Sequence, residues 1–262
     1  MPEGDTIHYL ASRIRPVLEG HVPDEIATPH PRFGRDRWPE RLSGRAVRAV
    51  DAYGKHLFVR FEGDLVIHSH LRMTGAWAVR PAGPAPPSAW LVMRRDSRDV
   101  IQLRGPVLEL MTESRTRFDQ RLAALGPDIL AAELDEPEFL RRLRHEDPTR
   151  PIGDALLDQR TIAGLGTIWR TEGCFAARLD APAAVHAQVR VDHEPALEAQ
   201  EQVLAVGVHG PHGAAGEPLL PARPAEAGMR SADLVRHVAG QHGADAVRGV
   251  VDRVALWHRF RG

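Results

Sequence analysis

The first residues of the chain, Met1-Pro2-Glu3, have types that could do chemistry. Removal of Met1 would leave Pro2 with a free secondary amine beside the carboxyl group of Glu3. An α-amino group titrates near ~7.7–8.0, so a useful fraction is neutral and nucleophilic at neutral pH. Attack of this amine on an aldehyde carbon gives an iminium ion, and an adjacent carboxyl can move protons for it. Taken alone, these residues are also compatible with an ordinary second-position proline and a solvated glutamate.

Lys55 is a second candidate, because it is the single lysine among 34 lysine and arginine residues. A GC-rich coding sequence explains why arginine replaces lysine elsewhere. A lysine kept at one position favours a site that needs a compact ammonium group rather than a planar guanidinium. The alternative interpretation is a solvated lysine in a turn.

Composition limits the classes of protein that the chain can represent. With 262 residues, 43% of them hydrophobic, it can form one large or two ordinary domains. We see no signal-peptide pattern and no apolar run near the ~18–20 residues of a membrane span. The single cysteine, Cys174, excludes a disulfide framework and a cysteine-rich zinc finger, and it favours a reducing compartment. The net charge of −1 argues mildly against a dedicated nucleic-acid binder, although a basic groove can lie on a neutral protein.

Hydrophobic periodicity divides the elements that must position these residues into two kinds. Residues 5–20 predict an amphipathic helix, capped by Asp5 and ended by Gly20. From about 22 to 110 the pattern is strand-like: two alternating strands meet at Gly54-Lys55, residues 64–80 add another strand, and residues 89–95 and 99–105 add two more. This pattern predicts one helix packed on a β-sandwich.

The second half of the chain is helical up to about residue 180 and different in composition beyond it. Residues 125–130 (LGPDIL) predict a turn that closes the first unit, so we place a domain boundary at about 130. Gly164 and Gly166 interrupt the chain just before a new helix. Residues 207–228 read as a long loop, and the segment after Ser231 has weak helical periodicity.

Three segments carry a specific resemblance when they are taken together. They are Pro2-Glu3-Gly4-Asp5; GKHL (54–57) followed by HSHLRMTG (68–75); and LLDQ (156–159) followed by AGLGTIWRTE (163–172). In order and spacing, the chain resembles the formamidopyrimidine-DNA glycosylase/endonuclease VIII family over roughly residues 1–180. Its opening and its HLRMTGAW segment are more similar to the endonuclease VIII side, in the actinobacterial form.

The resemblance implies an α+β multidomain fold. Its expected parts are an N-terminal catalytic domain (1–130) with a helix and a β-sandwich, a helix–two-turns–helix DNA-binding domain (131–206), and a divergent, irregular or helical tail (207–262). It also implies that Pro2 attacks C1′ of a flipped nucleotide, that Glu3 assists opening of the sugar ring, and that Lys55 binds a phosphate. The iminium ion then allows β,δ-elimination of the flanking phosphates.

The same resemblance implies a set of DNA-binding residues: His70, Arg72, Met73, Arg104, Gln159, Gly164, Gly166, Thr167 and Ile168. Met73 matches a side chain that wedges into the duplex, and the alternative is a core methionine at a strand end. Thr167 replaces the asparagine that the family usually has, and its hydroxyl can still donate to a phosphate. The glycines before a helix N-terminus suit close approach to a phosphate. His68 and His70 share one strand face, but two possible ligands do not predict a metal site.

The chain departs from the family in its last third. Members usually end in a four-cysteine zinc finger, whereas the only cysteine here lies upstream at position 174, so we expect no metal and no other cofactor. Three explanations remain open: a zinc-less finger, divergence into a DNA-binding relative without activity, or a shifted reading frame after about Phe175.

The favoured function is a bifunctional DNA glycosylase/AP lyase of base-excision repair, acting on oxidised bases and more on pyrimidines than on purines. The expected partner is damaged double-stranded DNA, with no membrane, and the expected state is a monomer in the bacterial cytoplasm, associated with the nucleoid. A non-catalytic relative that recognises abasic or damaged DNA is the alternative. A small-molecule enzyme with an N-terminal proline, such as a tautomerase, fits the other motifs poorly. The preferred lesion cannot be read from these residues.

Overall fold

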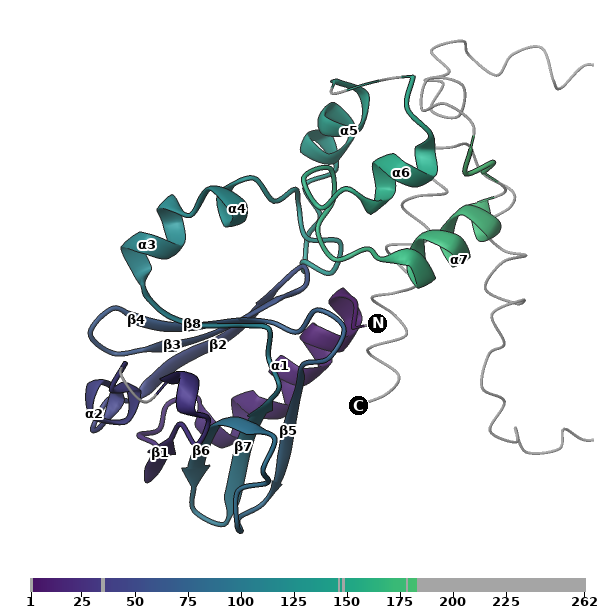
Figure 1. The fold of residues 1–262 in the computed structure, drawn as a ribbon. Coiled ribbons are helices and arrows are strands. Elements are labelled where there is room, and N and C mark those ends of the chain that lie inside the picture. Colours follow the sequence, from purple (N-terminus) through teal and green to yellow (C-terminus); the bar gives the residue numbers. More distant parts are fainter. Residues whose placement is uncertain (1, 34–35, 146, 148, 178, 183–262) are drawn as a thin grey trace, which may run out of the picture.

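The computed structural model describes residues 2–33, 36–145, 147, 149–177 and 179–182, and these residues form an α+β fold (Figure 1). Eight strands form two antiparallel sheets in the first part of the chain, and helices follow. The predicted tail (207–262) and the second part of the predicted 131–206 domain lie outside the described residues.

Helix α1 (Gly4–Leu18) covers one end of the sandwich and contacts strands of both sheets. Its buried face consists of Ile7, Ala11, Ile14 and Leu18, which follow the helical period that the sequence predicts. The N-cap is Glu3 rather than the predicted Asp5. Glu3 does not cap α1 through its side chain, because its carboxylate bonds to a distant helix.

One sheet has the order β2-β3-β4-β8, and all of its neighbouring strands are antiparallel. Its strands are β2 (Val47–Tyr53), β3 (His56–Phe61), β4 (Leu65–His70) and β8 (Val107–Thr112). The predicted pair of strands around Gly54-Lys55 is confirmed, since Tyr53 pairs with His56 across that turn. Strand β8 is an element that the sequence pattern did not reveal.

The second sheet has the order β1-β6-β7-β5. It contains β1 (Glu25–Ala27), β5 (Ala76–Pro81), β6 (Ala89–Arg95) and β7 (Arg98–Leu103). The prediction of a single strand over 64–80 is wrong. A tight turn, in which the Gly75 amide donates to the Leu71 carbonyl at 2.9 Å, divides it into β4 in one sheet and β5 in the other.

Short helices connect and cover the sheets. A 3₁₀ turn (Pro31–Phe33) and α2 (Trp38–Leu42) lie between β1 and β2. Helices α3 (Glu113–Phe118) and α4 (Gln120–Ala123) follow β8 and lie over the outer face of the β2-β3-β4-β8 sheet (Figure 1). Of the side chains on that face, His68 is only 2% exposed.

The helical part contains α5 (Glu136–His145), α6 (Ile152–Leu157) and α7 (Thr167–Ala177). Two main hydrophobic clusters support the fold. One joins α1 to both sheets. The other joins these helices around Phe139, Leu143 and Ile152, and it includes Cys174. Between the α6 and α7 helices, residues 158–166 form the connection that carries Gly164 and Gly166.

Candidate active site

The start of α1, the Gly54-Lys55 turn and the 163–166 connection meet at one place. The Gly4 amide donates to the Gly164 carbonyl at 2.9 Å. At Gly54, which has φ +54°, a Cβ atom would lie 2.8 Å from the Cβ of Ala163. Since real Cβ contacts are not that short, this close approach requires glycine. Three of the segments that the sequence singled out are thus brought into direct contact.

The Glu3 carboxylate is fixed on the N-terminus of α7. It is 2% exposed and accepts hydrogen bonds from the backbone amides of Gly166 (3.0 Å), Ile168 (2.9 Å) and Trp169 (3.3 Å). The first amides of a helix have no partner within the helix, and the helix dipole favours an anion there. The carboxylate therefore has a defined position beside Pro2, which is half-buried.

The Lys55 ammonium is half-buried and feels the charge of this carboxylate. Burial lowers the pKa of Lys55 below its usual value of 10.5, and the charge of Glu3 partly opposes that shift. A half-buried ammonium near a fixed carboxylate is not the solvated turn lysine of the alternative interpretation. Lys55 is thus within reach of the charge of the Glu3 carboxylate, which stands beside Pro2.

Strand register brings the remaining predicted residues of the sandwich to the same end. His56 pairs with His70, and His70 pairs with Val107, the first residue of β8. Ala76 pairs with Leu103, the last residue of β7. The 71–75 loop, with Arg72 and Met73, and the 104–106 loop, with Arg104, therefore run side by side.

Met73 is 69% exposed in the 71–75 loop, so core packing does not account for it. Arg72 and Arg104 are also exposed, and both have left-handed backbone conformations, with φ of 50° and 45°. This conformation is uncommon for residues other than glycine, and it turns the backbone at Arg72 in one loop and at Arg104 in the other. The exposure agrees with the wedge and groove roles predicted for these residues, which remain predictions.

His70 holds the 71–75 loop, because its Nδ1 accepts a hydrogen bond from the Arg72 amide at 3.1 Å. Burial and the charges of Arg72, His68 and Lys55 lower the pKa of His70 to about 4. A neutral ring that accepts at Nδ1 carries its proton on Nε2. The partly exposed ring can thus donate from Nε2 to an acceptor such as a phosphate.

The connection before α7 is held internally by Gln159. Its Oε1 accepts from the Gly164 amide at 3.0 Å, and its Nε2 donates to the carbonyls of Leu157 and Leu165 at 3.0 and 2.7 Å. These bonds use the amide group of Gln159 to hold Gly164, which has φ +104°. Its predicted part in DNA binding would therefore act through the shape of the turn. Thr167 and Ile168, at the first turn of α7, are exposed.

Asp128 is a residue of this site that the sequence analysis missed. It is 3% exposed, and its Oδ2 accepts from the Gly54 amide at 2.9 Å and faces His8 Nε2 at 2.8 Å. Its Oδ1 accepts from the Leu130 amide at 2.9 Å. One carboxylate thus joins α1, the Lys55 turn and the helical part. The only signal in the sequence was an aspartate in the LGPDIL turn.

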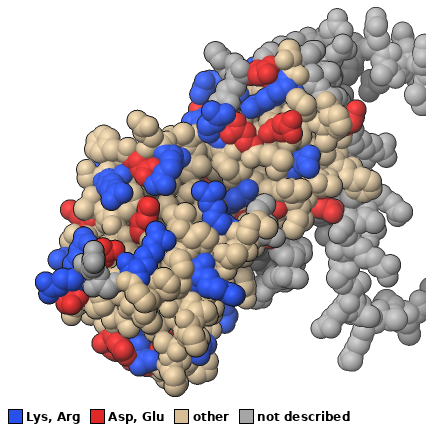
Figure 2. Space-filling view, viewed as in Figure 1, with Lys and Arg blue, Asp and Glu red and all other residues tan. Residues whose placement is uncertain are grey.

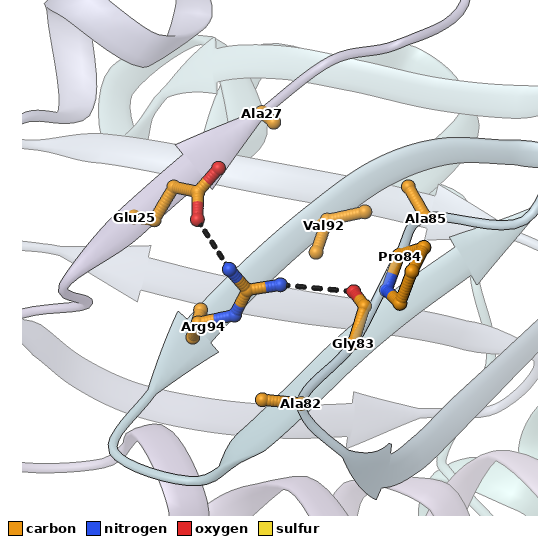
Figure 3. Close-up of a pocket in the computed structure, with 8 residues that line it drawn as sticks. All are labelled: Glu25, Ala27, Ala82, Gly83, Pro84, Ala85, Val92 and Arg94. Atoms are coloured by element: carbon orange, nitrogen blue, oxygen red, sulfur yellow. Dashed lines mark hydrogen bonds and ion pairs between the residues drawn. The ribbon is translucent and has the colours of Figure 1, made fainter.

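The charge on the face in Figure 2 is mixed, with basic side chains on both parts of the molecule and acidic ones between them. A pocket of about 510 Å³ lies elsewhere, lined by β1, β6 and the 82–85 loop (Figure 3). There Arg94 is bonded to Glu25 and to the Gly83 carbonyl. The pocket contains none of the predicted site residues, and its arginine is already paired.

Metal and membrane features were also sought in the part of the chain that the structure describes. No group of three or more His, Cys, Asp or Glu residues there could hold a metal ion. Cys174 is 4% exposed and packs in the helical core. No described helix is long and apolar enough to cross a membrane.

Comparison with known proteins agrees with this geometry. Residues 1–107 match the formamidopyrimidine-DNA glycosylase N-terminal domain, and residues 125–215 match the formamidopyrimidine-DNA glycosylase H2TH domain. The chain therefore belongs to the formamidopyrimidine-DNA glycosylase/endonuclease VIII family.

Several bacterial relatives are similar over about two thirds of the chain. It is 38% identical to "DNA-(apurinic or apyrimidinic site) lyase Nei2" of Mycolicibacterium smegmatis, over 67% of this chain and 66% of the relative. It is 36% identical to "Endonuclease 8 2" of Mycobacterium tuberculosis, over 68% of each chain. It spans 63% of the length of "Probable endonuclease 8 2" of Streptomyces coelicolor, at 39% identity.

Solved structures with the same fold include wild-type Lactococcus lactis Fpg in a complex with DNA containing N7-benzyl-Fapy-dG. That structure has a TM-score of 0.62 at 23% identity, over 72% of each chain. A complex of the Lactococcus lactis protein with DNA containing an abasic site also has a TM-score of 0.62, at 22% identity, over 72% of this chain and 71% of that one.

Proposed function

We propose that this protein is a bifunctional DNA glycosylase and AP lyase that removes oxidised bases, pyrimidines in preference to purines, from double-stranded DNA. The observation that carries the proposal is the Glu3 carboxylate, held beside Pro2 by three amides at the N-terminus of α7 and acting on the charge of Lys55. The names of relatives, endonuclease 8 and AP lyase, support the same activity.

In the proposed reaction, the free amine of Pro2 attacks C1′ of the flipped nucleotide. The bond from C1′ to the base breaks, and the departing base takes a proton from water. The Glu3 carboxylate takes the proton that the attacking amine loses and passes it to the ring oxygen as the bond from C1′ to that oxygen breaks. The resulting iminium ion acidifies the C2′ hydrogens. Loss of a C2′ proton expels the 3′ phosphate, and a second elimination expels the 5′ phosphate. Lys55 holds a phosphate at the lesion. This scheme needs no metal and no organic cofactor.

Borohydride trapping on duplex DNA with an abasic site tests the proposal. Reduction of the iminium ion should leave a covalent adduct between protein and DNA, and Pro2→Gly should cut its yield sharply. An equal yield from protein with a blocked N-terminal amine would overturn the assignment of the nucleophile. Binding of the wild-type protein without any adduct would instead favour the alternative, a non-catalytic relative that recognises abasic or damaged DNA.

We further propose that the protein binds no structural zinc, since the chain has one cysteine and that cysteine is buried in α7. Metal analysis of the purified protein should give less than one zinc per chain. Deletion of residues 207–262 should abolish binding to lesion DNA if that segment acts as a zinc-less finger. It should change little if the segment is a drifted or frameshifted remnant. We propose a monomer that acts in the bacterial cytoplasm at the nucleoid.

A further inference from the structure

Three histidines form a row on the outer face of the β2-β3-β4-β8 sheet, under α3 and α4. His56 Nδ1 and His68 Nε2 are 2.8 Å apart, and their rings stack with centroids 5.1 Å apart. The His70 ring meets His56 edge-on, at 4.7 Å. His68 Nδ1 faces Glu109 Oε2 at 3.5 Å. His56, His68 and Glu109 take no part in the proposed reaction.

The positions of the protons in this row follow from the partners. His68 Nδ1 and Glu109 Oε2 are both buried and face each other, and the same Glu109 oxygen forms an ion pair with Arg121 at 3.6 Å. Buried polar atoms are normally satisfied, and a bare ring nitrogen would repel a carboxylate, so His68 carries its proton on Nδ1. Its Nε2 is then an acceptor, and His56 must donate to it from Nδ1. The Nε2 of His56 is left without a proton.

The surroundings keep the row neutral. Burial lowers the pKa of His68 despite Glu109 and Asp119, which raise it, while Arg121 lowers it further. Burial also lowers the pKa of His56 to about 3, together with His68, His70, Arg72 and Arg121. With each ring neutral, the contact of His68 with Glu109 and the contact of His56 with His68 permit a single arrangement of protons.

The row leads to the candidate active site at one end. His56 directly follows Lys55, and the ring that it supports, His70, accepts from the Arg72 amide. We infer that Glu109, His68 and His56 form a positioning chain: Glu109 orients His68, His68 orients His56, and His56 supports His70 under the Lys55 turn and the 71–75 loop. The kinetic consequence rests on the proposed function, whereas the proton arrangement does not.

Nuclear magnetic resonance of the full chain labelled with ¹⁵N-histidine tests the arrangement without DNA. At neutral pH, we expect His56 and His68 to carry the proton on Nδ1, and His70 on Nε2. Glu109→Gln should shift His56 and His68 toward mixed tautomers. The matched control is Glu113→Gln, because Glu113 lies next to the same face but bonds to Arg48 and Arg60, and it should leave all three tautomers unchanged. A His56 proton on Nε2 in the wild-type protein would overturn the chain.

The kinetic arm uses His56→Phe, which keeps a ring in the stack and removes its hydrogen bond. Cleavage of DNA with a preformed abasic site should slow about 5- to 10-fold, the effect of losing one buried hydrogen bond. Glu113→Gln should cleave at the wild-type rate. An unchanged rate in a folded His56→Phe variant would refute the positioning role. Absence of cleavage by the wild-type protein would refute the proposed function instead, and the tautomers would still decide whether the chain exists.

Discussion

At the scale of single residues, Glu3 has two tasks in one carboxylate. It stands beside the amine of Pro2, and it also fills the unpaired amides at the start of α7. A group that joins two segments 163 residues apart positions both of them. Substitution of Glu3 should therefore change the fold as well as the chemistry.

Glu3→Gln places an NH₂ group against amide donors that need an acceptor. We expect loss of oxidised-base release, partial retention of cleavage at preformed abasic sites, and a free energy of unfolding lower by about 1–3 kcal/mol. Urea unfolding and a base-release assay on the same preparation measure both effects. Unchanged base release would show that Glu3 does not transfer protons, and unchanged stability would contradict its anchoring role.

Lys55 should make DNA binding sensitive to alkaline pH. Its pKa lies below 10.5 because burial disfavours the charged form, so the ammonium loses its proton at a lower pH than a solvated lysine does. Affinity for abasic DNA should fall as the pH rises through the pKa of Lys55 in the wild type but not in Lys55→Arg, whose guanidinium stays charged.

Lys55→Ala should make the dependence of log affinity on log salt shallower by roughly one unit. An unchanged salt slope would place Lys55 away from the DNA.

At the scale of elements, close contacts fix how the start of α7 meets Glu3 at the start of α1. A Cβ atom at Gly166 would lie 2.4 Å from the Glu3 carboxyl carbon, so any side chain there must displace Glu3 from α7. On the central strands β3 and β4, three histidines lie in contact at the end of the sheet that leads to the site. Both features make the site sensitive to changes outside the reacting groups.

Gly166→Ala should therefore reproduce part of the Glu3→Gln phenotype, with lower stability and slower base release. Gly83→Ala is the matched control, because no atom lies within 4 Å of the Cβ position at Gly83. Thermal unfolding and base release of the two variants provide the comparison. Equal behaviour of the two would mean that the connection adjusts and that the contact at Gly166 is not restrictive.

The buried histidines should make the fold unstable in acid. The pKa of His56 is lowered to about 3 and that of His70 to about 4, so the unfolded chain binds protons that the native protein excludes. Stability is complete above the unfolded value of ~6.5 and falls as the pH drops toward 4. Each pH unit costs up to about 1.4 kcal/mol per histidine. Unfolding midpoints at pH 7 and 4.5 should differ less for His56→Phe than for the wild type, and an equal difference would contradict this origin.

At the scale of the whole molecule, the β-sandwich and the helical part are joined by a small number of buried contacts. Asp128 accepts a hydrogen bond from the Gly54 amide and faces His8, and both of these residues belong to the sandwich part. Its other oxygen accepts from the Leu130 amide in the turn that contains Asp128. Tyr53 adds a hydrogen bond to the Gly126 carbonyl at 2.8 Å. The candidate site lies at this junction, so its geometry depends on both parts.

Asp128→Asn should weaken the junction, because an NH₂ group replaces an oxygen that faces donors. We expect a loss of about 2–4 kcal/mol in the free energy of unfolding, measured by denaturant titration. Asp135→Asn is the control, since Asp135 accepts from the nearby Glu138 amide at the start of α5. A cost for Asp128→Asn no larger than for Asp135→Asn would mean that this carboxylate does not hold the two parts together.

The sequence by itself determined the local features of this protein. Alternation in residues 47–61 predicted the hairpin that carries Lys55, the helical period predicted α1, and the motifs predicted the family and named Pro2, Glu3 and Lys55 as reactive residues. The hairpin, the helix and the family are confirmed, because side-chain periodicity and short motifs act over a few residues, and the reactive roles stay predictions. The motif at 71–75 also marked Met73, although its exposure became known only from the fold.

Only the tertiary structure decided how these residues meet. The division of 64–80 between two sheets, the register that aligns His56 with His70, the capping of α7 by Glu3 and the central place of Asp128 all depend on contacts between segments far apart in the chain. Such contacts leave no local period in the sequence, because hydrogen bonding across a fold depends on the packing of whole elements. For that reason candidate reactive residues could be named from the sequence, whereas the groups that hold them in place could not.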